Sequence, residues 1–191
     1  MSARSIKGWS RRILLIVLVS NGVAAESSVP TAREARVMAL NPVADAYVTA
    51  GWPSMNFGDQ FVLNAYGEDD KISYIRFDLS ALEGREVQSA RLRFHVRNPT
   101  HDVVEVREVG VVPWDEDRIT YLNRPEVREL LVSLETADVR DWHEVDLTAT
   151  ICAHSGEVYT IALINTGFDP MGIDSRENRD AMPVLEVTLA P

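Results

Sequence analysis

The chain has 191 residues, one cysteine and a formal net charge of −10, from 19 basic and 29 acidic residues. This length suits a single domain, and 46% hydrophobic residues suffice for a buried core. The negative charge argues against a nucleic-acid partner, because phosphate contacts require basic surface. One cysteine excludes an intrachain disulfide, and we expect Cys152 to be a small buried side chain.

The first 25 residues have the layout of a secretory signal peptide. Four basic residues precede the apolar run 13–19, and small residues follow it up to Ala25. A transmembrane helix needs roughly 20 apolar residues, so this run is too short to span a membrane. We therefore expect cleavage after Ala25 and a secreted protein, extracellular or periplasmic, that does not span the membrane.

Residues 26–42 follow the predicted signal peptide and are predicted to be a flexible linker. The segment begins with polar residues, and Pro30 and Pro42 interrupt it. The folded domain is therefore expected to occupy residues 43–191.

The remainder of the chain is patterned for short strands. Apolar and polar side chains alternate along 71–79 and 89–97, which is typical of strands with one buried face. Further strands are predicted at 46–49, 61–65, 103–112, 142–147, 158–164 and 184–189, a strand or a helical turn at 128–134, and a short helix at 148–154. Frequent turn residues between these segments predict an all-β fold, an antiparallel β-sandwich of the jelly-roll type.

Common catalytic motifs are missing from the sequence. It contains no G-x-S-x-G, no H-E-x-x-H and no phosphate-binding glycine loop, so we expect no enzyme activity. The alternative is a small polysaccharide lyase or hydrolase, which would require reactive side chains gathered in one cleft. The residues available for such a cleft are Tyr74, Arg76, Arg91, Arg93 and His95.

Basic side chains concentrate on one face of the strand at 89–97. They are Arg91, Arg93, His95 and Arg97, and Tyr74 and Arg76 lie on the polar face of the strand at 71–79. Guanidinium groups bind carboxylates and sulfates in a bidentate manner, so this pattern predicts a sheet face that binds acidic polysaccharide. The alternative is a solvated face whose basic residues pair with acidic residues on neighbouring strands.

Tryptophan side chains offer a second route to sugar binding. The apolar face of a pyranose ring stacks on aromatic rings, and Trp52 lies in a turn where we expect it to be exposed. Trp52 is therefore included among the ligand-binding residues. Trp114 and Trp142 are flanked by apolar positions and are expected to pack in the core.

Loop carboxylates indicate a structural calcium ion as the expected cofactor. Calcium takes six to eight oxygen ligands, and acidic residues occur in loops at Asp69-Asp70, at Asp115-Glu116-Asp117 and at 169–177, which contains Asp174 and Glu177. The alternative is that these carboxylates are only solvated.

Several short motifs occur in a fixed order along the chain: Ala44-Asp45-Ala46, Asn56-Phe57-Gly58, Tyr74 to Ser80, Trp114-Asp115-Glu116, Val145 to Thr148 and Ser175-Arg176-Glu177. Together they resemble the DNRLRE domain, a secreted β-sandwich similar to carbohydrate-binding module family 96, over residues 41–191. The resemblance implies a non-catalytic module that binds a polysaccharide or cell-surface glycan, in some members an acidic polysaccharide of the alginate type. A structural or adhesive module of the cell envelope, without a sugar ligand, is the alternative.

The resemblance also bears on the calcium site. In a sandwich whose first and last strands are neighbours, Asp45 and Glu177 come together, so the expected metal ligands are Asp45, Asp174 and Glu177. Pairing of Arg176 with one of these carboxylates is the alternative.

Overall fold

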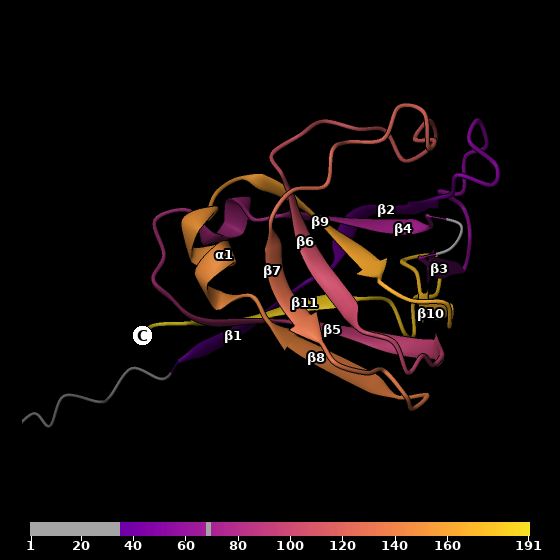
Figure 1. The fold of residues 1–191 in the computed structure, drawn as a ribbon. Coiled ribbons are helices and arrows are strands. Elements are labelled where there is room, and N and C mark those ends of the chain that lie inside the picture. Colours follow the sequence, from indigo (N-terminus) through magenta and orange to yellow (C-terminus); the bar gives the residue numbers. More distant parts are fainter. Residues whose placement is uncertain (1–34, 68–69) are drawn as a thin grey trace, which may run out of the picture. The chain divides into compact units, whose positions relative to one another are not determined.

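The structure is a computed structural model that describes residues 35–67 and 70–191. The predicted signal peptide lies outside these residues. The described chain forms two antiparallel sheets packed against each other, with one 3-10 helix, η1 (Ser80–Leu82), and one short α-helix, α1 (Thr148–Ala153) (Figure 1). This architecture confirms the predicted all-β sandwich.

Each sheet combines strands from distant parts of the sequence. The first sheet has the order β1 (Arg36–Leu40), β11 (Val184–Leu189), β5 (Val87–Asn98), β10 (Met171–Asp174) and β3 (Val62–Ala65), and β8 (Trp142–Asp146) also pairs with β5. The second sheet has the order β2 (Pro42–Val48), β4 (Ile72–Asp78), β9 (Val158–Asn165), β6 (Val104–Gly110) and β7 (Leu130–Leu134).

The main core lies between the two sheets. Alternate residues of each strand supply it, because successive side chains of a strand point to opposite faces. From β5 and β4 these are Ala90, Leu92, Phe94, Val96, Ile75 and Phe77, all 2% exposed or less. Burial of this apolar surface is the dominant force that holds the sheets together.

A second apolar cluster lies on the outer face of the second sheet. The connection between β6 and β7, residues 111–129, passes over this face (Figure 1) and supplies Ile119, with Trp114 packed against the cluster. Tyr74 of β4 is fully buried here, and its hydroxyl donates to the carbonyl oxygen of Pro125 at 3.0 Å. The expectation that Tyr74 lies on an open polar face is therefore wrong, because the loop covers that face.

Most predicted elements are present, and 128–134 contains the strand β7 while 148–154 contains α1. The linker predicted for 26–42 is wrong from Arg36 onward, because β1 pairs with β11 along its whole length. Cys152 is exposed rather than buried, since the short helix α1 turns Ile151 into the core and leaves its neighbour at the surface. Within the described residues, no helix is long and apolar enough to cross a membrane.

Candidate functional site

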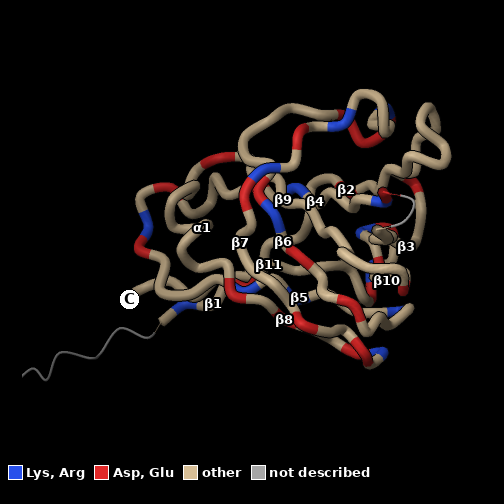
Figure 2. The backbone as a smooth tube through the Cα atoms, viewed as in Figure 1, with Lys and Arg blue, Asp and Glu red and all other residues tan. Residues whose placement is uncertain are grey.

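Arg91, Arg93, His95 and Arg97 form a basic stripe on the outer face of β5. Acidic residues on the adjoining strands pair with these side chains. Arg91 Nη1 lies 2.9 Å from Glu144 Oε1, and Arg93 Nη1 lies 2.6 Å from Glu186 Oε1. Acidic and basic residues are interspersed along this sheet (Figure 2). All four side chains are between 38% and 54% exposed, so each pair is weak and contributes about 1 kcal/mol or less. The arrangement corresponds to the paired, solvated face.

Asp174 was expected to be a metal ligand, but its carboxylate instead contacts His95 and Arg97 at the end of the basic stripe. Its side chain is 3% exposed and accepts from Asn178 Nδ2 at 2.7 Å. His95 Nδ1 lies 2.6 Å from one of its oxygens, and Arg97 Nη1 lies 3.4 Å from the other. Both oxygens of Asp174 therefore have protein partners.

Arg76 has a structural environment beneath the loop at 111–129. Its Nη1 donates to the carbonyl oxygen of Trp114 at 2.7 Å, and its guanidinium lies 4.7 Å from the centre of the Trp114 ring. Arg76 and Tyr74 belong to β4 in the second sheet, whereas Arg91, Arg93 and His95 belong to β5 in the first. The five residues of the lyase alternative are therefore divided between the two sheets.

Trp142 is exposed at the surface, which corrects the expectation that it packs in the core. Its side chain is 38% exposed, and the guanidinium of Arg93 lies 5.3 Å from its ring centre. In the antiparallel pairing Trp142 stands opposite His95, and the outward-facing Glu144 is two residues further along β8. That alternation along β8 is the signal by which the sequence could have placed Trp142 on the outer face.

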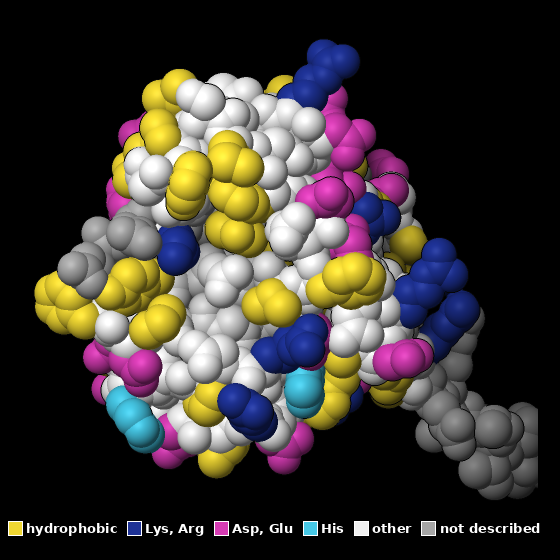
Figure 3. Space-filling view, turned by 90° about the vertical axis from the view of Figure 1, so that its right-hand side faces the viewer, with side chains coloured by type: hydrophobic (Ala, Val, Ile, Leu, Met, Phe, Trp, Pro, Cys, Tyr) yellow, Lys and Arg dark blue, Asp and Glu magenta, His cyan; other side chains and the backbone are white. Residues whose placement is uncertain are grey.

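Aromatic side chains gather around a hollow of about 210 Å³ where β2 ends and β4 begins. Its lining residues are Tyr47, Thr49, Trp52, Met55, Phe57 and Lys71. Trp52 is 63% exposed, which agrees with the expectation for the turn. Tyr47 and Phe57 stack with ring centres 4.5 Å apart and planes inclined by 15°. Figure 3 views the end of the sandwich that carries this turn, where hydrophobic side chains gather beside basic ones.

Local backbone hydrogen bonds shape the turn that carries Trp52. The Trp52 N–H donates to the Thr49 carbonyl oxygen at 3.3 Å, and the Met55 N–H donates to the Trp52 carbonyl oxygen at 3.0 Å. Sequence reasoning singled out Trp52 but missed Tyr47 and Phe57, because their stacking joins a strand to the turn that follows it. The motif Asn56-Phe57-Gly58 was the sequence feature that could have indicated a role for Phe57 in this turn.

Asn56 fastens this turn to the loop at 111–129. Its Nδ2 donates to the carbonyl oxygens of Glu116 at 2.7 Å and of Ile119 at 2.8 Å, while its Oδ1 accepts from the Gly58 N–H at 3.2 Å. A Cβ atom at position 58 would lie 2.2 Å from the Glu116 carbonyl oxygen, so the close approach requires glycine. Glu116 is held in place by these contacts.

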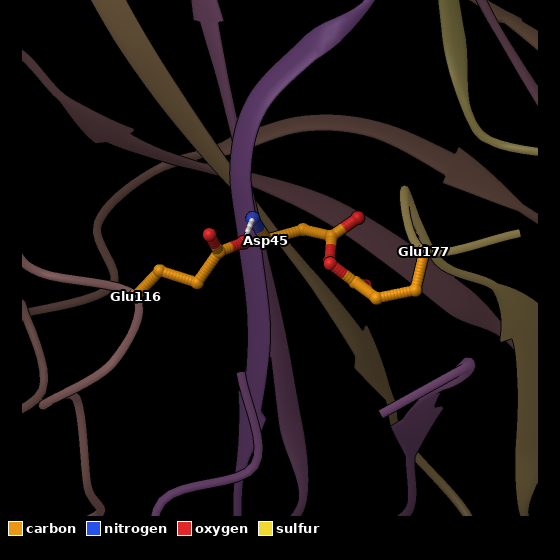
Figure 4. A group of neighbouring side chains, drawn as sticks. All are labelled: Asp45, Glu116 and Glu177. Atoms are coloured by element: carbon orange, nitrogen blue, oxygen red, sulfur yellow. Dashed lines mark hydrogen bonds between the residues drawn. The ribbon is translucent and has the colours of Figure 1, made fainter. Parts of the chain in front are cut away.

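Three carboxylates meet beside β2: Asp45, Glu116 and Glu177. One oxygen of each lies within 4.8 Å of the other two, and the carboxylates of Asp45 and Glu177 point toward each other (Figure 4). Because β2 is an edge strand, the Asp45 N–H is free of the sheet and donates to Glu116 Oε1 at 2.7 Å. The structure thus brings Asp45 and Glu177 together, with Glu116 rather than Asp174 as the third member.

Burial dominates the electrostatics of this carboxylate cluster. Asp45 is fully buried, and loss of hydration raises its pKa to about 8, against the N–H bond that it accepts from Arg176 at 2.8 Å. The nearby charges of Glu177 and Glu116 raise the pKa further. Among the described residues, Asp45 Oδ1 and Glu177 Oε2 are buried without a hydrogen-bond partner.

A β-sandwich with a concave aromatic site at the end of its strands is typical of a small ligand-binding module. The chain belongs to carbohydrate-binding module family 96, whose family model matches residues 36–189. The match includes β1, in agreement with the pairing of that strand in the first sheet. A search of curated proteins found no match.

Proposed function

We propose that the protein is a secreted, non-catalytic module that binds a glycan by holding one sugar residue in the hollow around Trp52. The observation that carries this proposal is an indole side chain 63% exposed beside the stacked rings of Tyr47 and Phe57. Membership of a carbohydrate-binding module family supports the ligand class. Localisation outside the cytoplasm follows from the predicted signal peptide.

The chemistry of the hollow suits a pyranose ring. The C–H face of the sugar stacks on an aromatic ring, while Thr49 and Lys71 bring a hydroxyl and an ammonium group to the same lining. The ammonium group of Lys71 favours a sugar that carries a carboxylate, such as a uronate. At about 210 Å³, the hollow is smaller than the 300–1,000 Å³ typical of pockets for drug-sized ligands, so it suits one sugar ring.

The outer face of β5 and β8 is the second candidate surface for the same ligand class. The exposed Trp142 beside Arg93 favours it, because a ring and a guanidinium together suit an acidic sugar. Arg91 and Arg93 already pair with Glu144 and Glu186, so a polyanion would have to displace those carboxylates.

Affinity electrophoresis of the purified full chain in gels containing neutral or uronate polysaccharides tests the proposal. We expect Trp52→Ala to weaken retention at least tenfold, the loss of about 1.4 kcal/mol, and Lys71→Gln to weaken retention by uronate polymers selectively. Trp142→Ala removes an exposed indole elsewhere and is the matched control. Loss with Trp142→Ala but not Trp52→Ala would move the site to the sheet face. A folded protein retained by no polymer would favour the structural or adhesive alternative.

A further inference from the structure

We propose that Asp45 and Glu177 bind a single calcium ion beside Glu116, whose own oxygens accept from the Asp45 N–H and from Arg176 Nη1. Asp45 lies in β2, Glu116 in the loop at 111–129, and Glu177 between β10 and β11. The inference does not depend on the proposed glycan function, because none of the three residues lines the aromatic hollow.

Unpaired oxygens point to the ion. Asp45 is fully buried, yet its Oδ1 has no hydrogen-bond partner among the described residues, and the same holds for the buried Glu177 Oε2. A buried carboxylate oxygen without a donor is strongly destabilising unless a positive charge or a proton compensates it. The two carboxylates face each other (Figure 4), so one cation between them would satisfy both.

The local charge sets the valence of the ion. Three carboxylates carry a charge of −3 when ionised, and Arg176 is the guanidinium against them, with Nη1 2.7 Å from Glu116 Oε2 and 3.9 Å from Glu177 Oε1. The remaining charge of −2 is the charge that a divalent cation neutralises.

The donor set selects calcium among divalent cations. The cluster offers carboxylate oxygens and neither histidine nor cysteine, so it lacks the nitrogen and sulfur ligands typical of zinc. Its oxygens come from three separate segments and lie up to 4.8 Å apart, which suits the longer bonds and flexible geometry of calcium better than the strict octahedron of magnesium.

A proton shared between Asp45 and Glu177 is the competing explanation. Burial raises the pKa of Asp45, which favours a proton on the ion-free site. Calcium binds the ionised carboxylates and would displace that proton, so a calcium site predicts a response to added calcium, whereas a shared proton predicts none.

Calorimetric titration and thermal unfolding of the chelator-treated full chain distinguish them. With calcium chloride we expect one ion per chain and a rise in Tm that equimolar magnesium chloride does not reproduce. Glu177→Gln, which keeps the size of a partly exposed side chain, should weaken calcium binding at least tenfold and abolish the rise in Tm. Asp117→Asn removes an exposed charge one residue from Glu116 and should leave both unchanged.

Three results would overturn the proposal. The first is a folded wild-type chain that gives neither binding heat nor a Tm shift at millimolar calcium, as a shared proton would. The second is Glu177→Gln binding calcium like the wild type, which would put the ion elsewhere. The third is an equal loss of calcium affinity in Asp117→Asn and Glu177→Gln, which would show that calcium is attracted by the general negative charge of this surface and not bound at one site. Asp45→Asn changes a fully buried residue, so the partly exposed Glu177 carries the test.

Discussion

The side-chain amide of Asn56 donates to the carbonyl oxygen of Glu116, 60 residues further along the chain, at 2.7 Å. This bond connects the turn that bears Trp52 and Phe57 to the loop that contributes a carboxylate to the cluster beside β2. The aromatic hollow and the carboxylate cluster therefore share a mechanical support, although the ligands proposed for them are chemically unrelated.

Replacing Asn56 with alanine should weaken this support. The carbonyl oxygens of Glu116 and Ile119 lose their donor, and we expect the free energy of unfolding to fall by about 1–3 kcal/mol. Urea denaturation measures the change. Gln60→Ala alters an exposed residue of the same segment and should change stability by less than about 0.5 kcal/mol. Equal stability of the two variants would contradict the bracing role.

Removing the hydroxyl of Tyr74 should change stability but not glycan binding. Tyr74→Phe deletes a buried donor and leaves the Pro125 carbonyl oxygen unpaired, which should cost about 0.5–1.5 kcal/mol. Retention by polysaccharide should match the wild type, because the side chain has no exposed surface. A folded Tyr74→Phe protein with weakened retention would return this residue to the binding surface.

The arginines of the stripe should prove nearly neutral for stability. Arg91→Ala and Arg93→Ala each remove an exposed ion pair, so each should change the free energy of unfolding by about 1 kcal/mol or less. If the hollow is the glycan site, retention of the double variant by uronate polymers should equal that of the wild type. Loss of retention in the folded double variant would instead support the sheet face.

Asp146 should make a small acid-sensitive contribution to stability. Hydrogen bonds from Thr148 lower the pKa of this exposed carboxyl below its usual 3.8. The folded state then binds fewer protons than the unfolded state, so the contribution is complete above pH 3.8 and is lost as the pH falls through the folded pKa.

Asp146→Asn keeps the acceptor oxygen but does not titrate. We expect the wild type to exceed this variant in stability above about pH 4, by about 1 kcal/mol or less, and the difference to shrink below that pH. Urea denaturation between pH 2 and pH 6 measures both proteins. A difference that grows in acid would contradict the assignment.

Alternating side chains explain why most strands could be predicted. The pattern is clear in β5, which has one face in the core and the other in solvent. It is absent from β10, whose four residues are all buried, and obscured in β1, a short edge strand whose residues are mostly exposed. Both strands were missed for that reason.

The functional residues were harder to predict, because their surroundings depend on long-range packing. Alternation put Tyr74 on the face away from the main core, but only the fold shows that the loop at 111–129 buries that face. The positions of Arg91 and Arg93 were correctly inferred, yet their pairing with Glu144 and Glu186 depends on strand order. Glu116 was among the loop carboxylates considered for calcium, but its position beside Asp45 depends on how the loop at 111–129 lies against β2.

The exposure of Cys152 provides a single point for chemical attachment. The chain has no other cysteine, so a thiol-reactive dye would label one position. Lys71 at the hollow precedes the start of β4, whereas Leu79 beyond its end pairs with Gly156 and Glu157, which follow α1. A dye on α1 would therefore lie at the opposite end of β4 from the hollow, where it could report or immobilise the protein without covering the proposed glycan site.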